Sequence, residues 1–274
     1  MACSSPSQRF DRVAGELSLS YRDIPGKGFV HRVYFNSAKR RDGVLHVYLG
    51  GDGTPWIGGV VVASDPTPRN PLGLRLMALD DRDSLYLGRP CYHGVGRAAD
   101  CDSALWTSAR YSETVADSMA EVLRGVMDAQ GYEALSFIGF SGGGALAMIL
   151  AERFAQTRQV VTLAGNLDTE AWVKLHHYDA LSGSLNPREQ PTLREDIQQY
   201  HLAGGEDGNI PSELIEQAIA EQPRFQFLRF EHFTHGCCWE QIWPDLLSCL
   251  AVDCDWQSSY PRDGQGKEEG DLSD

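Results

Sequence analysis

The 274-residue sequence predicts an α/β fold, in which a mainly parallel sheet carries helices on both faces. Short runs rich in β-branched and aromatic residues alternate along most of the chain with segments whose apolar residues recur at helical spacing. Apolar residues make up 42% of the chain and charged residues 23%, which is typical of a globular domain. This alternation of strands and helices is typical of a parallel sheet covered on both sides.

The predicted elements follow one another with few interruptions. Strands are expected at residues 30–35, 45–49, 84–87, 134–140, 160–163, 197–202 and 225–230. Helices are expected at residues 112–129, 142–154, 210–220 and 239–250, with Ser112 as an N-cap of the first.

The segments that lack this alternation of strands and helices set the domain boundaries. We expect one domain over residues 30–255. The N-terminal segment 1–29 precedes it, and disorder is expected over residues 1–10. Residues 168–193 contain Gly and Pro without a clear period, which indicates a short lid-like insertion. The stretch 256–274 is rich in Gly and acidic residues and is expected to be a frayed tail.

The charge balance excludes some partners. The formal net charge is −14, and the largest basic cluster is the run at 39–41, which is typical of a solvated turn. We therefore expect no nucleic-acid partner, and strongly anionic substrates are disfavoured. No apolar run reaches the roughly 18 residues that a membrane-spanning helix needs.

A Gly-x-Ser-x-Gly motif at residues 139–143 marks the candidate nucleophile, Ser141. A predicted strand runs into the motif and a helix without proline runs out of it, so the serine is expected at a sharp turn above the sheet. A phosphate-binding loop is the alternative, but no Lys follows and the glycine spacing differs.

A serine hydroxyl needs a general base, and His235 is the candidate. It lies between the last predicted strand and the last helix and is followed by Gly236, which suits a loop reaching over the sheet. His232 is the alternative. The pair His176–His177 lies in the lid-like insertion without carboxylate or Cys partners at regular spacing, so no metal site is expected.

The acid that orients the histidine is predicted to be Asp207, in a Gly-rich turn 28 residues before His235. Asp168, which follows an earlier strand, and Glu206 are the alternatives. The order Ser, Asp, His along the chain is typical of one group of serine enzymes.

Backbone N–H groups are expected to stabilise an oxyanion. The residue after the nucleophile, Gly142, supplies one, and the loop at 50–53 supplies the other, through Asp52 or alternatively Gly51. Trp56 and Phe140 are the candidate substrate-pocket residues. Tyr92 and Trp106 are further aromatic candidates, and core packing is the alternative for both of them and for Trp56.

The seven cysteines indicate the cellular compartment in which the protein is expected. Cys3 lies in a context that resembles the lipid-attachment site of a bacterial lipoprotein, which would give the chain a membrane tether. The other six suit three disulfides in an oxidising compartment, the cell envelope. The alternative is a cytoplasmic protein with free, buried thiols. The suggested pairs are Cys91 with Cys101, and Cys237 or Cys238 with Cys249 or Cys254.

These motifs, in this order, resemble the α/β-hydrolase superfamily over roughly residues 30 to 252. The runs at 49–56, 87–91 and 106–111 resemble a poorly characterised bacterial esterase-like group, although Gly50–Gly51 replaces the more usual His-Gly. The resemblance implies hydrolysis of a small-molecule carboxylic ester or thioester through an acyl-enzyme, without metal or cofactor. A peptidase or amidase with the same triad and a non-catalytic envelope scaffold are the alternatives.

Overall fold

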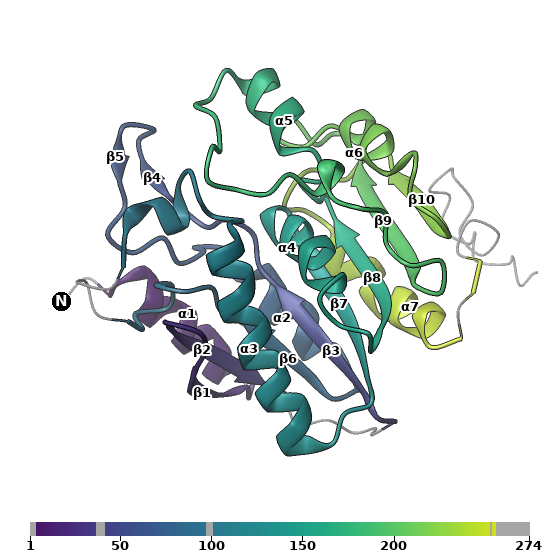
Figure 1. Ribbon diagram of the computed structural model, residues 1–274, viewed down its shortest axis with the longest axis horizontal. Helices are drawn as coiled ribbons and strands as arrows, with labels where there is room; N and C mark the ends of the chain where they lie inside the picture. The colour runs from purple at the N-terminus through teal and green to yellow at the C-terminus, as the bar shows by residue number, and fades with distance from the viewer. Residues whose placement is uncertain (1–3, 37–41, 97–100, 253, 256–274) are drawn as a thin grey trace, which may run out of the picture.

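The sheet of the computed structural model has eight strands in the order β1-β2-β6-β3-β7-β8-β9-β10 (Figure 1). Neighbours from β6 to β10 are parallel, whereas β1–β2 and β2–β6 are antiparallel. The structure describes residues 4–36, 42–96, 101–252 and 254–255. The strands are β1 (Ser20–Pro25), β2 (Val30–Phe35), β3 (Val44–Leu49), β6 (Ser84–Leu87), β7 (Ala134–Phe140), β8 (Thr157–Leu163), β9 (Gln198–Gly204) and β10 (Phe225–Phe230).

Helices cover both faces of the sheet, so the predicted fold class is confirmed. One core lies under α3 (Glu113–Gln130), α4 (Gly142–Ala151) and α6 (Ser212–Ile219). The other lies under α1 (Pro6–Glu16), α2 (Leu72–Ala78) and α7 (Trp239–Leu250). Successive residues of the buried strands supply the two cores in turn, as a strand between two helical layers requires.

The α3 helix shows how local sequence sets an element. The Ser112 hydroxyl accepts a hydrogen bond from the Val115 N–H and begins the helix. Gly131, at φ 73°, ends it in the left-handed region that glycine adopts without steric cost. The helix predicted over 112–129 is confirmed at both ends to within a residue.

The N-terminal segment differs from its prediction. Disorder over residues 1–10 is wrong for the helical part, since α1 begins at Pro6. Ser5 and Gln8 form a capping box, and Phe10 and Ala14 are buried against the sheet. The helical spacing of Phe10, Ala14 and Leu17 was available in the sequence and was overlooked, whereas β1, which pairs with β2 at the sheet edge, is mostly exposed and lacks the apolar run of a buried strand. Both elements therefore belong to the sheet and its core.

Two projections stand beyond the carboxyl ends of the central strands, near the top of Figure 1. The first is a hairpin of β4 (Trp56–Ile57) and β5 (Val61–Val62). The second is the segment 168–193, predicted as an irregular lid, which contains α5 (Thr169–His176) and a short 3-10 turn (Pro187–Glu189). They lie on either side of the region where the strands end.

Three disulfides are present in the described residues. Cys91 and Cys101 are bonded, as predicted. The predicted pairing across the last helix is wrong, because Cys237 is bonded to Cys238 and Cys249 to Cys254. The helix α7 separates the two ends by roughly 16 Å at 1.5 Å per residue, whereas bonded cysteines need Cα atoms within about 7 Å.

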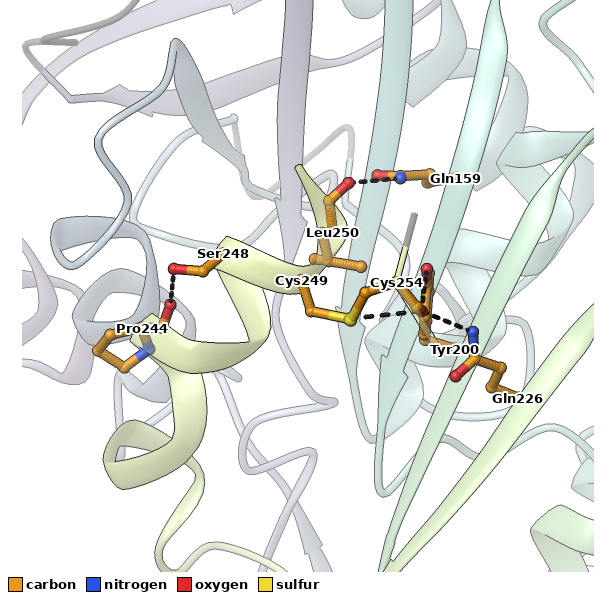
Figure 2. Close-up of a disulfide and its surroundings, with 8 residues drawn as sticks. All are labelled: Gln159, Tyr200, Gln226, Pro244, Ser248, Cys249, Leu250 and Cys254. Carbon is orange, nitrogen blue, oxygen red and sulfur yellow. Dashed lines mark hydrogen bonds between the residues drawn. A yellow bond between two sulfur atoms is a disulfide. The ribbon is translucent and has the colours of Figure 1, made fainter. Parts of the chain in front are cut away.

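The Cys249–Cys254 disulfide links the end of the described chain to the last turn of α7. Figure 2 shows Cys254 folded back from the end of α7 toward β9 and β10. The Cys254 carbonyl accepts a hydrogen bond from Gln226 Nε2 on β10 at 3.0 Å. Cys3, the basic run 39–41 and the tail 256–274 lie outside the described residues.

Candidate active site

The candidate nucleophile lies where β7 passes into α4. Ser141 has φ 55° and ψ −122°, a strained conformation for a residue with a side chain. The Ser141 N–H donates to the carbonyl of Leu163 on the adjacent β8 at 3.0 Å, which fixes the turn against the sheet. A Cβ on Gly139 would overlap the Gly143 carbonyl, so the close approach of strand and helix requires glycine there. The turn therefore presents the serine Oγ above the sheet.

His235 connects the serine to a carboxylate. Its Nε2 lies 3.0 Å from Ser141 Oγ, and its Nδ1 lies 2.8 Å from Asp207 Oδ2. The Asp207 side chain is fully buried, whereas the imidazole is 26% exposed. A carboxylate at Nδ1 holds the proton on that nitrogen and leaves Nε2 free to accept the proton of the hydroxyl.

The Asp207 carboxylate is itself oriented by the turn in which it lies. Its second oxygen, Oδ1, accepts hydrogen bonds from the backbone N–H groups of Asn209 at 2.8 Å and Ile210 at 2.9 Å. A buried carboxylate needs such donors to offset the loss of water. The turn between β9 and α6 thus aims Oδ2 at the histidine.

The alternatives considered from the sequence lie elsewhere. The His232 side chain is 89% exposed and lies 3.2 Å from Glu206, on the outer surface. Asp168 caps α5, where its Oδ1 accepts from the Ala171 N–H at 3.0 Å. The structure therefore brings Ser141, Asp207 and His235 together, and it places His232, Glu206 and Asp168 in other contacts.

The glycine-rich loop after β3 lies beside the nucleophile. A Cβ on Gly51 would lie 3.3 Å from the Ser141 Cβ, and a Cβ on Gly142 would overlap the Asp52 carboxylate. The loop and the first residue of α4 thus meet at Ser141, as an oxyanion site requires. The choice between the N–H groups of Asp52 and Gly51 stays a prediction.

The Asp52 side chain is the centre of a buried polar cluster that the sequence did not indicate. Its carboxylate accepts from Arg89 Nη1 at 2.7 Å, Arg110 Nη1 at 2.8 Å and the Tyr111 hydroxyl at 2.6 Å. Burial alone would raise the pKa of Asp52, but the charges of Arg110 and Arg89 and the Tyr111 hydrogen bond outweigh it and hold that pKa well below its usual range. The carboxylate is therefore ionised and the loop is tied to two other segments.

The same cluster also holds the backbone of the loop. Arg89 Nη2 donates to the Gly50 carbonyl at 3.0 Å, and the Tyr92 hydroxyl donates to the Asp52 carbonyl at 3.0 Å. The runs at 87–91 and 106–111, which carry the two arginines, are the signal that was available in the sequence. The sequence alone does not indicate that their arginines meet Asp52.

Asn209 is a second residue that the sequence reasoning missed. Its side-chain Nδ2 lies 3.1 Å from Nε2 of His235, the nitrogen that also faces Ser141. Its backbone carbonyl accepts from Trp172 Nε1 at 3.1 Å and lies 2.7 Å from His176 Nε2, both on α5. One residue thus contacts both the imidazole and the lid-like insertion.

A cavity of about 1090 Å³ opens above the serine. Ser141, His235 and both candidate pocket residues, Trp56 and Phe140, line it, and the Phe140 ring centroid lies 5.0 Å from that of His235. Tyr92 and Trp106 are buried in the core instead, which agrees with packing. A volume of this size accommodates a substrate with an extended apolar part.

The described ranges contain no group of three or more His, Cys, Asp and Glu side chains placed to hold a metal ion. Within the same ranges, every helix is too short or too polar to cross a bilayer.

The arrangement of strands and helices is that of the α/β-hydrolases, and the chain has that fold. A serine hydrolase homologue from Coxiella burnetii matches with a TM-score of 0.60 and 14% identity, over 86% of this chain and 97% of that one. A lipase-like protein from Acinetobacter baumannii matches with a TM-score of 0.63 and 12% identity, over 92% and 97%. An esterase from Pyrococcus furiosus matches with a TM-score of 0.57 and 12% identity, over 87% and 91%.

These likenesses confirm the predicted α/β-hydrolase fold. No family model matches the sequence. No curated protein matches it either.

Proposed function

We propose that the protein is a serine hydrolase that cleaves carboxylic esters or thioesters through an acyl-enzyme on Ser141. The observation that carries the proposal is the continuous chain of contacts from Ser141 Oγ through the imidazole to Asp207, at 3.0 and 2.8 Å, on the wall of a cavity. The named activities of the structural relatives, a lipase and an esterase among them, agree with it.

In the first half-reaction, His235 Nε2 takes the Ser141 proton as Oγ attacks the carbonyl carbon. The oxyanion that forms is held by the N–H groups of Gly142 and the loop 50–53, and Asp207 stabilises the imidazolium. The imidazolium then gives its proton to the leaving alcohol or thiol, and the acyl group stays on Oγ.

In the second half-reaction, His235 accepts a proton from water, which attacks the acyl carbon. The tetrahedral intermediate collapses, the carboxylic acid leaves, and Ser141 regains its proton.

The choice of ester over amide rests on the resemblance of the sequence motifs and on the apolar side chains of the cavity. Trp56, Val60 and Phe140 line its wall, where they would contact an acyl chain. Amide cleavage uses the same triad, so a direct comparison of substrates is needed.

A panel of p-nitrophenyl esters and peptide p-nitroanilides provides that comparison. We expect turnover of the esters that Ser141→Ala lowers by roughly 10⁴-fold or more, and little turnover of the anilides. Preferential cleavage of the anilides would replace the esterase with a peptidase. Turnover of neither, by a correctly folded protein, would favour a scaffold that only binds ligands.

A further inference from the structure

Both projections beside the cavity carry solvent-exposed apolar side chains. Each is between 37% and 79% exposed, a large fraction for residues of this kind. We call this set the apolar rim. Its members are Trp56, Ile57, Val60, Val61 and Val62 on the β4–β5 hairpin, and Leu175 and Tyr178 at the end of α5.

The apolar rim is continuous with the entrance to the cavity. Trp56 and Val60 of the hairpin and Tyr178 of the lid-like insertion belong to the rim and also line the cavity that leads to Ser141. In Figure 1 both projections stand on the side where the strands end. Exposed apolar surface of this kind marks an interaction site. Whatever covers the rim therefore also lies against the entrance.

Charge narrows the choice of partner. Residues 53–64 contain no charged side chain, although the chain as a whole has a formal net charge of −14. An anionic surface would be repelled by the protein, whereas a neutral apolar surface would not. A second copy of the chain on the rim would close the entrance, which disfavours self-association as the purpose of this surface.

The N-terminal end of the described chain lies beside the hairpin. The Ser7 N–H and hydroxyl both donate to Asp65 Oδ2, at 3.0 and 2.7 Å, and Asp65 follows β5 by three residues. Cys3, the predicted lipid-attachment residue, lies outside the described residues. The described chain thus begins beside the hairpin that carries most of the rim.

We propose that the apolar rim docks on a neutral lipid surface, from which the site draws esters with long acyl chains. The inference rests on the proposed ester hydrolysis for its substrate class, while its docking part stands on the rim alone. Insertion of the hairpin tip would remove its valines from water and place the cavity entrance at the lipid.

Vesicle binding tests the docking part separately from catalysis. We expect the protein to sediment with phosphatidylcholine vesicles, and Val61→Asp to weaken this binding by about tenfold, because a charge replaces a side chain that would be buried in lipid. Val252→Asp, at a valine that is 74% exposed at the far end of α7, is the matched control and should bind like wild type.

Three outcomes would contradict docking on a neutral lipid surface. One is equal vesicle binding by wild type and Val61→Asp. Another is dimerisation through the rim. Light scattering would then show a dimer of the wild type, and the Val61→Asp variant would be a monomer. Tighter binding to phosphatidylglycerol vesicles than to phosphatidylcholine would contradict a neutral partner.

Kinetics test the substrate class. The readout is the ratio of turnover on an emulsified long-chain ester to turnover on p-nitrophenyl acetate, a water-soluble ester. We expect this ratio to fall about tenfold in Val61→Asp and to stay within about twofold in Val252→Asp. An unchanged ratio in Val61→Asp would contradict the inference while leaving ester hydrolysis intact. Absence of turnover on both substrates would contradict the proposed function and leave the vesicle result to decide docking.

Discussion

The side-chain amide nitrogen of Asn209 lies 3.1 Å from Nε2 of His235. With Nδ1 protonated toward Asp207, Nε2 is an acceptor, so the amide donates to the nitrogen that must receive the Ser141 proton. In the proposed acyl-enzyme, Ser141 Oγ would no longer donate, and Asn209 would remain as a donor that holds the ring in place. We infer that Asn209 positions the imidazole during deacylation.

Replacing Asn209 by Ala should therefore lower kcat by about fivefold with a smaller change in KM, because a hydrogen bond of about 1 kcal/mol is lost. The contact between its backbone carbonyl and α5 is retained in this variant. Stopped-flow measurement of acylation and deacylation checks which step slows. His232→Ala, at an exposed position in the loop that also carries His235, is the control. A kcat equal to that of wild type would show that Asn209 does not position the ring.

The Asp52 cluster should matter for both stability and rate. Asp52→Asn leaves Arg89 and Arg110 without their counter-charge, although their side chains are only 5% and 8% exposed. We expect a loss of about 3 kcal/mol in the free energy of unfolding and a fall in kcat of about 100-fold, because the loop 50–53, which is proposed to bind the oxyanion, would be displaced.

Urea unfolding and steady-state kinetics check the two effects. Asp23→Asn removes a charge whose side chain is 40% exposed, paired with Arg32, and should change both quantities little. Loss of stability with kcat unchanged would show that the cluster supports the fold without setting the geometry of the loop.

Two disulfides should have separable roles. Cys237–Cys238 begins two residues after His235, next to Trp239, whose Nε1 donates to the His235 carbonyl at 3.0 Å. Its replacement by two serines should lower kcat several-fold with little change in stability, since the loop that it closes is minimal.

The Cys91–Cys101 pair closes a longer loop away from the imidazole. Its replacement by two serines should lower the free energy of unfolding by roughly 2–3 kcal/mol and leave kcat largely unchanged. Thermal unfolding and ester kinetics on both double variants provide the test. The same pattern of effects in the two variants would contradict this division.

Acid should destabilise the fold through its buried histidines. Burial lowers the pKa of His31 to about 4 and those of His93 and His201 to about 3. The unfolded chain binds these protons near pH 6.5, so this stability is complete above pH 6.5 and is lost as the pH falls toward 4. Each histidine contributes up to about 1.4 kcal/mol per pH unit.

Urea unfolding at pH 7 and pH 5 measures the effect. His201→Gln should reduce the loss between these values by about 2 kcal/mol, whereas His232→Gln, at an exposed position, should leave it unchanged. An identical loss in wild type and His201→Gln would mean that other groups cause the acid sensitivity.

The features that depend on local sequence pattern were predicted best. Ser141 follows from a motif between a strand and a helix, and the central strands follow from runs of β-branched and aromatic residues. Asp207 and His235 follow from the turns after two strands, although only the geometry of the structure distinguishes them from the alternative residues.

Contacts between residues that are far apart in the sequence could not be predicted. Asp52 meets Arg89 and Arg110 across 37 and 58 residues, and no local spacing encodes such pairing. The amide of Asn209 meets His235 across 26 residues in the same way. The predicted disulfide pairing across α7 was wrong for a different reason, since the helix expected at 239–250 already holds its two ends too far apart for a disulfide.

Labelling with a fluorophosphonate tests most directly the claim that Ser141 is an activated nucleophile. Peptide mass spectrometry of wild type should show one adduct on Ser141. Ser141→Ala should lose the adduct, and His235→Ala should label more slowly by several orders of magnitude. Failure of the folded wild type to form the adduct, or equal labelling of His235→Ala, would contradict a serine hydrolase built on these residues.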